Sequence, residues 1–147
     1  MKSCFIYKTE KEYKIITEHE SDTGLGLEDK PIFILPIESD IVNIKESIFK
    51  SLNSSRKNVP FPKDVKEWQK EGLKRMAEKS FKGLYEKSNS VGIRIEKNIL
   101  TICPSKYMPK MGIVPIEEDM IKMEYSLDKE IEITKKILEI LEIDYKI

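Results

Sequence analysis

A short motif that occurs twice constrains the fold of this chain more than any other feature. The segment 34–40 (ILPIESD) is echoed by the segment 113–119 (IVPIEED). Each copy follows two apolar runs of strand-favouring residues and precedes a stretch in which apolar residues recur every three or four positions. The sequence therefore predicts a β-β-β-α unit that is used twice.

The length and composition indicate one domain. A chain of 147 residues is long enough to bury a core without disulfides or metals. Hydrophobic residues make up 39% of the chain and are grouped into runs, which argues against disorder. We interpret residues 1–147 as a single domain with pseudo-repeats at about 4–54 and 90–142, connected by a basic helical segment.

The first half of the chain predicts three strands followed by a helix. The apolar runs 4–7 and 13–16 predict a hairpin, and residues 32–35 predict a third strand. Apolar residues at helical spacing then predict a helix over 43–53, with Asn43 as its N-cap.

The middle of the chain is basic. Residues 50–87 carry 11 Lys and Arg against 5 Asp and Glu, a balance of +6. The parts before and after stand at −4 (6 against 10) and −2 (9 against 11). Within this segment a proline-containing connector at 56–63 precedes a predicted helix over 64–79, for which Asp64 is the N-cap.

The second half repeats the strand pattern. Alternating apolar residues from 91 to 95 predict a strand with one buried face. The run 99–103 returns as a strand that Pro104 ends, residues 111–116 form a third strand, and a helix follows over 127–142. Together with the first half, these elements predict an α+β fold with a mostly antiparallel sheet that is covered by helices.

Reactive residue types are few, and their surroundings predict structural roles. His19 is the only histidine and stands among acidic residues, so we expect an exposed loop residue rather than a general base or metal ligand. Cys4 and Cys103 lie in apolar runs, which predicts buried thiols. The segment 23–26 (TGLG) is followed by Glu28, whose charge would repel a phosphate, so its glycines predict a turn. We predict no catalytic activity, cofactor, metal or small-molecule ligand.

The sequence also predicts the compartment. No apolar run approaches the roughly 18 residues that would span a bilayer. The first residues lack the apolar region and the cleavage site of a secretory signal. We therefore expect a cytoplasmic protein without a membrane partner.

Several short motifs, in order, resemble those of the immunity protein family of bacterial contact-dependent growth inhibition (CDI). The resemblance covers nearly the whole chain and departs from the family pattern at residues 120–125. It implies a protein without catalytic activity that binds and neutralises the C-terminal toxin domain of a cognate cell-surface effector, often a nuclease. The motifs are KSCFIYK at 2–8, TGLG at 23–26, ILP at 34–36, SSR at 54–56, KSFKGLY at 79–85 and ICP at 102–104.

Acidic residues gathered in one segment are the predicted toxin-binding site. Residues 18–31 contain two glycines, one proline and five acids, which predicts a long surface loop. A nuclease active site is usually cationic because it holds phosphates, so carboxylates on an inhibitor would raise both the association rate and the specificity. The predicted toxin-binding residues are Glu18, Glu20, Asp22, Glu28 and Asp29.

Two other functions fit parts of the sequence. A nucleic-acid-binding module would use the lysine-rich segment 50–87, where Phe61, Trp68, Phe81 and Tyr85 are interleaved with the basic residues. Core packing is the commoner role of aromatic residues at helical spacing, and the lysines then lie on a solvated face. A small enzyme would require His19 beside a cysteine in an apolar pocket.

Overall fold

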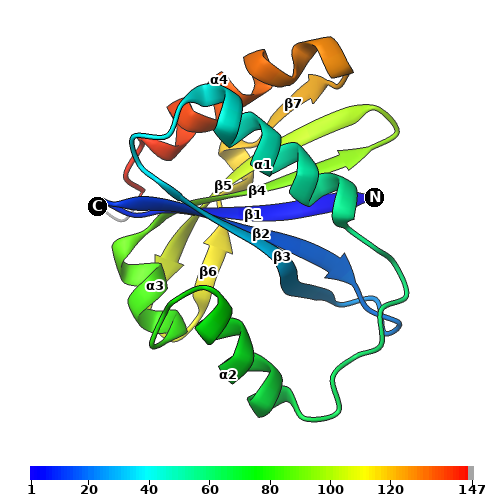
Figure 1. The fold of residues 1–147 in the computed structure, drawn as a ribbon, viewed down its shortest axis with the longest axis vertical. Coiled ribbons are helices and arrows are strands. Elements are labelled where there is room, and N and C mark those ends of the chain that lie inside the picture. The colour runs from blue at the N-terminus through cyan, green and yellow to red at the C-terminus, as the bar shows by residue number, and fades with distance from the viewer. Residues whose placement is uncertain (146–147) are drawn as a thin grey trace.

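Seven strands form one antiparallel sheet in the computed structural model, which describes residues 1–145 (Figure 1). The strand order is β3-β2-β1-β4-β5-β6. The strand β7 also pairs with β5, along a different part of β5 than β6 does. Together with four α-helices this is the predicted α+β fold. The strands are β1 (Lys2–Lys8), β2 (Glu12–Glu20), β3 (Gly26–Pro36), β4 (Asn89–Glu96), β5 (Ile99–Met108), β6 (Gly112–Pro115) and β7 (Ile121–Glu124).

The two halves of the chain share this sheet. The first strand of each half lies at the centre, where β1 and β4 pair antiparallel with Phe5 opposite Gly92. Each half then runs outward in chain order. The second copy of the repeated motif differs from the prediction, because residues 117–119 form a short 3-10 turn that leads into β7 and not into a helix.

Three of the four α-helices in the described part of the chain begin at side-chain caps, which the sequence only partly predicts. Asp40, and not Asn43, caps α1: its carboxylate accepts a hydrogen bond of 2.9 Å from the backbone N–H of Asn43, so the helix starts two residues earlier than expected. The predicted helix over 64–79 corresponds to α2 alone and ends four residues early, at Arg75, because Ala77 has a φ of +56°; Ser80 then caps a separate helix, α3. The helices are α1 (Ile41–Ser54), α2 (Val65–Arg75), α3 (Phe81–Lys87) and α4 (Glu130–Leu141), the last preceded by a 3-10 turn at Leu127–Lys129.

Two predicted strand ends are wrong for physical reasons. Residues 18–31 are not a loop, because β2 and β3 continue through them and leave only a short turn at Gly24, whose φ is +85°. Likewise β5 continues through Pro104. Proline has no backbone N–H, but Pro104 lies between the part of β5 that pairs with β7 (Ile99 to Ile102) and the part that pairs with β6 (Ser105 to Met108). No hydrogen bond of either ladder is therefore lost.

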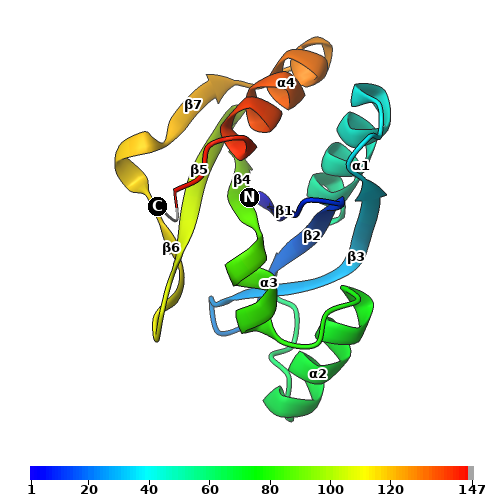
Figure 2. The same cartoon turned by 90° about the vertical axis from the view of Figure 1, so that its left-hand side faces the viewer.

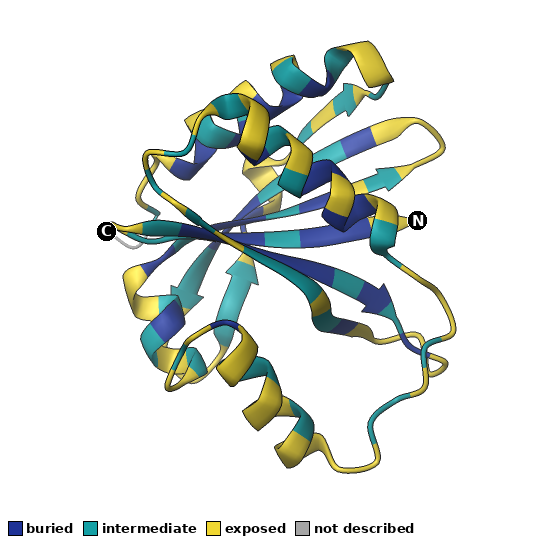
Figure 3. Ribbon diagram, in the orientation of Figure 1, coloured by how far each residue is buried: buried dark blue, intermediate teal, exposed yellow. Residues whose placement is uncertain are grey.

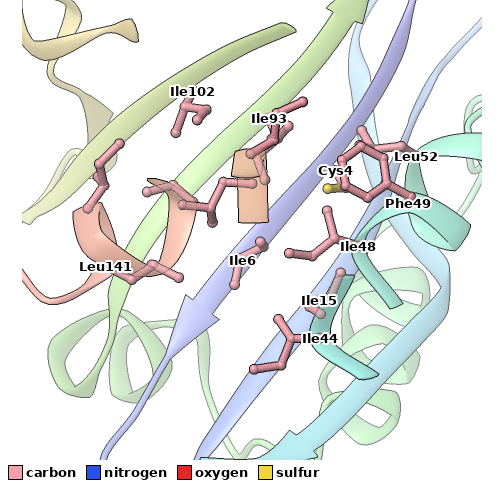
Figure 4. Packing of buried hydrophobic residues seen from close by; sticks show 14 of the residues in the cluster. Cys4, Ile6, Ile15, Ile44, Ile48, Phe49, Leu52, Ile93, Ile102 and Leu141 are labelled. Atoms are coloured by element: carbon pink, nitrogen blue, oxygen red, sulfur yellow. The ribbon is translucent and has the colours of Figure 1, made fainter. Parts of the chain in front are cut away.

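Alternating residues of the strands build two apolar cores on opposite faces of the sheet. On one face Cys4 and Ile6 pack against α1 and α4, where Ile48 is fully buried (Figure 4). On the other face Phe5 and Tyr7 pack against α2 and α3 in a smaller cluster. Figure 3 shows how much of α2 stays exposed, and none of its residues is buried.

Among residues 1–145, none of the helices is both long enough and apolar enough to cross a membrane.

Candidate functional site

One face of the sheet is only partly covered. The helices α1 and α4 lie side by side at one end of the molecule, while α2 and α3 lie at the other (Figures 1 and 2). The face that carries α2 and α3 therefore keeps a groove of about 770 Å³ over β1, β4 and β5. The groove is lined by Met1, Ser3, Cys4, Phe5, Glu18, Gly92, Arg94, Glu96, Lys97, Ile99, Thr101, Cys103, Ser105, Ile113, Pro115, Glu117, Met120 and Lys122.

A second hollow, here called the pocket, lies between the α2–α3 segment and the strands β2 and β3. Its volume is about 340 Å³. Glu18 lines both hollows, so the groove and the pocket are neighbours. The pocket is lined by Ile16, Glu18, Gly26, Glu28, Ile32, Trp68, Gln69, Gly72, Met76, Phe81 and Tyr85.

The predicted toxin-binding acids do not form one loop patch. Glu18 and Glu28 lie directly opposite each other on β2 and β3, and Glu20 follows on the same face of β2. Asp22 lies in the exposed turn, where its carboxylate accepts a hydrogen bond from the backbone N–H of Phe61. Asp29 is already held in an ion pair of 2.8 Å with Arg75 of α2. The structure thus brings Glu18 and Glu28 together. Asp29 does not join them, because its carboxylate pairs with Arg75.

Burial and the neighbouring Glu18 change the acidity of Glu28. The hydroxyl of Ser3 donates a hydrogen bond of 2.9 Å to Glu18, and the hydroxyl of Tyr7 donates one of 3.2 Å to Glu28. Burial, followed by the charge of Glu18, raises the pKa of Glu28 to about 7. Burial and the charge of Glu28 likewise raise the pKa of Tyr85 to about 12. The carboxyl group of Glu28 therefore titrates close to neutral pH.

Replacing Glu28 by glutamine should stabilise the protein in a pH-dependent manner. Because the pKa of Glu28 is raised on folding, its contribution to stability is present below the unfolded pKa and is lost as the pH rises through 7. Glu28→Gln and the unchanged protein should therefore have similar free energies of unfolding at pH 4. At pH 8 the variant should be more stable by about 2 kcal/mol, since one pKa unit corresponds to about 1.4 kcal/mol and solvent reduces the effect at a partly buried site.

Urea unfolding of both proteins between pH 4 and pH 8 measures this difference. Glu38→Gln, at an exposed turn position, is the matched control and should show no such trend. The interpretation fails if the difference between Glu28→Gln and the unchanged protein does not grow with pH.

A buried lysine fixes the wall of the pocket. Lys14 of β2 is 1% exposed, and its ammonium group donates hydrogen bonds to the carbonyl oxygen of Met76, at 2.6 Å, and to Glu78. Lys87 pairs with the same carboxylate at 2.8 Å. Burial raises the pKa of Glu78, but the hydrogen bonds from Lys14 and Lys87 outweigh it and lower that pKa. The segment between α2 and α3 is thereby tied to the sheet.

His19 is a structural residue and not an exposed loop residue. It is 6% exposed, and its Nε2 lies 2.9 Å from the carbonyl oxygen of Lys30. Its Nδ1 accepts a hydrogen bond of 3.1 Å from the backbone N–H of Arg56, so Nε2 is the nitrogen that carries the proton. With both nitrogens engaged by backbone groups, the histidine ties the connector after α1 to the hairpin.

The cysteines differ in their surroundings. Cys4 is 1% exposed, as predicted, and burial raises its pKa. Cys103 is only partly buried and lines the groove, which the apolar run around it did not predict. Within residues 1–145, no group of three or more His, Cys, Asp and Glu side chains is arranged to hold a metal ion.

Several groove residues were missed by the sequence reasoning. Arg94 and Thr101 line the groove from neighbouring strands, where they stand directly opposite each other. The alternation of Val91, Ile93 and Ile95 with polar residues did indicate that one face of β4 is not buried in the main core. This alternation shows which side chains point away from the core. It does not show that this part of the sheet is not covered by helices.

The fold and the site define a class of protein: a small α+β protein that presents one hollowed, charged sheet face. The model of the CDI immunity protein family matches residues 2–139. The chain therefore belongs to this family, which confirms the resemblance seen in its motifs, and a cognate toxin is its partner.

Two solved structures share the fold. A protein of unknown function from Neisseria meningitidis is similar with a TM-score of 0.74 and 20% sequence identity, over 96% of this chain and 93% of that chain. The CdiA-CT/CdiI toxin and immunity complex from Yersinia pseudotuberculosis is similar with a TM-score of 0.68 and 16% identity, over 97% of both chains. No curated protein matches this chain.

Proposed function

We propose that this protein binds and neutralises the C-terminal toxin domain of a cognate CDI effector, that the toxin is a nuclease, and that the protein acts in the cytoplasm without a reaction of its own. Membership of the immunity family over residues 2–139 is the observation that carries the proposal. The covered face of the sheet supplies a rigid scaffold, and the hollowed face offers a surface to a partner. Neutralisation then needs only a tight complex that keeps nucleic acid from the toxin.

The acidic residues of the pocket support a nuclease as the target, since no Lys or Arg is among the described residues that line it. Glu18 and Glu28 face the pocket, and Glu20 stands two residues after Glu18 on the same face. Phosphate-binding surfaces are cationic, so carboxylates at this position attract them and add specificity. Asp22 and Asp29 belong to the same proposed interface, with smaller effects because Phe61 and Arg75 already engage them.

A nuclease assay with the purified toxin domain, in the presence and absence of this protein, tests the proposed function. The C-terminal toxin domain of the cognate effector should degrade nucleic acid, and an equimolar amount of this protein should stop the degradation. Glu18→Gln/Glu20→Gln/Glu28→Gln should weaken the inhibition by at least tenfold. The control Glu38→Gln/Glu46→Gln/Glu132→Gln removes three charges from exposed positions outside the hollows and should leave it unchanged. Equal inhibition by both triple variants would refute the acidic interface.

A thiol reagent locates the toxin on the protein. Cys103 lines the groove and is partly exposed, whereas Cys4 is 1% exposed and serves as an internal control. A maleimide should label Cys103 slowly in the free protein, because burial raises its pKa, and more slowly still in the complex. Unchanged labelling in a saturated complex would place the toxin elsewhere.

A further inference from the structure

The pocket combines two carboxylates from the sheet with aromatic side chains from the helices. Its floor carries Glu18 and Glu28, which stand directly opposite each other in the β2–β3 ladder. Its sides carry aromatic rings from α2 and α3. At about 340 Å³ it lies at the small end of the range of ligand sites in proteins, which suits one side chain rather than a large molecule.

The two carboxylates lack a cationic partner among the described residues. Their hydrogen-bond donors are the neutral hydroxyls of Ser3 and Tyr7, and no ion pair within residues 1–145 reaches either group. The neighbouring acids Asp29 and Glu78, in contrast, each have a basic partner. Like charges directly opposite each other in a sheet are destabilising. A cation from outside the chain would relieve this repulsion.

The aromatic walls favour a planar cation. Trp68, Phe81 and Tyr85 line the pocket, and the rings of Phe81 and Tyr85 lie 6.1 Å apart between their centroids. The faces of aromatic rings attract cations, and a guanidinium group also stacks on them. Carboxylates hold the same group through paired N–H···O hydrogen bonds. The basic residues of α2 are not among the residues that line the pocket.

We propose that the pocket receives an arginine side chain of the toxin, with the guanidinium group held by Glu18 and Glu28 and stacked among Trp68, Phe81 and Tyr85. This assignment rests on the proposed function and names the chemistry of one contact within it. Removing one member of such a buried charge pair from an interface typically affects dissociation more than association. The pocket would then determine which toxin the protein recognises.

A small arginine derivative tests the pocket without the toxin. Trp68 is the only tryptophan in the chain, so its fluorescence reports on the pocket alone. Titration with Nα-acetyl-arginine methylamide at pH 8 should give a saturable fluorescence change, with a dissociation constant on the order of millimolar for one isolated side chain. The citrulline analogue, which is similar in shape but uncharged, should give none. Equal binding of both compounds, or no saturable signal with either, overturns the proposal.

Matched variants assign the signal to the carboxylates. Glu18→Gln/Glu28→Gln should weaken binding of the arginine derivative by at least tenfold, while Glu38→Gln should bind it unchanged. Urea unfolding of the double variant at the same pH separates a loss of binding from a loss of folding, and we expect the variant to be folded. Retained binding by the double variant overturns the proposal.

The same double variant separates this inference from the proposed function. It should bind the toxin domain at least tenfold more weakly than the unchanged protein does. If the unchanged protein binds toxin and the double variant binds it equally well, the pocket assignment is wrong and the immunity function stands. If the unchanged protein does not bind the toxin at all, the proposed function is wrong, whatever the result with the arginine derivative.

Discussion

Replacing Lys14 by alanine is expected to lower the free energy of unfolding by about 3–5 kcal/mol, the usual effect of removing one partner from a buried ion pair. The ammonium group is 1% exposed and bonds to Glu78, whose side chain is 4% exposed, and to the carbonyl oxygen of Met76. Without it, the carbonyl loses its partner and the buried carboxylate keeps only Lys87. Urea unfolding at pH 7 measures the change.

The exposed partner of Glu78 provides the control for Lys14→Ala. The Lys87 side chain is 52% exposed, so Lys87→Ala should cost about 1 kcal/mol or less. Hydrogen exchange should also show α2 and α3 opening before the main core in Lys14→Ala, since α2 has no buried residue of its own. Similar losses for the two variants would contradict the anchoring role of Lys14.

The second large effect is expected in the main core. Ile48→Ala should lower the free energy of unfolding by about 2–5 kcal/mol, because it removes apolar contacts and leaves a cavity. Ile48 is completely buried between α1 and the sheet, where Figure 4 places it among Ile6, Ile15 and Ile44. The protein cannot fill this space easily, since both α1 and α4 close over it.

A control for Ile48→Ala lies on the same helix. Val42 is 47% exposed, and Val42→Ala should change the free energy of unfolding by no more than about 0.5 kcal/mol. Thermal and urea unfolding of the two variants measure the contrast. If both substitutions have small effects, the main core is not where the structure places it.

Local patterns predicted the elements of the fold better than their ends. The spacing of Ile44, Ile48 and Leu52 predicts α1 because these residues face the core together. The cap was assigned to Asn43 because it lies within that pattern, although the carboxylate of Asp40 is the group that reaches the N–H of Asn43. The glycines and acids of 18–31 resembled a loop, because alternate residues of these strands carry charges on a partly uncovered face.

The site depends on contacts between residues that are far apart in the sequence. The acidic residues gathered in 18–31 indicate Glu18 and Glu28 as candidates, but nothing local shows that the register of β2 and β3 sets them opposite each other. Lys14 and Glu78 are 64 positions apart, and neither belongs to a recognisable motif. The sequence therefore identified the charged groups of the site, and the fold determines which of them face a hollow and which are already paired.

Growth of bacteria that express the toxin domain tests the central claim most directly. Induction of the C-terminal toxin domain of the cognate effector should stop growth, and co-expression of this protein should restore growth to the rate of cells without toxin. The triple variant Glu18→Gln/Glu20→Gln/Glu28→Gln should protect less well at equal protein level. Continued growth arrest in the presence of the folded, unchanged protein would contradict the account.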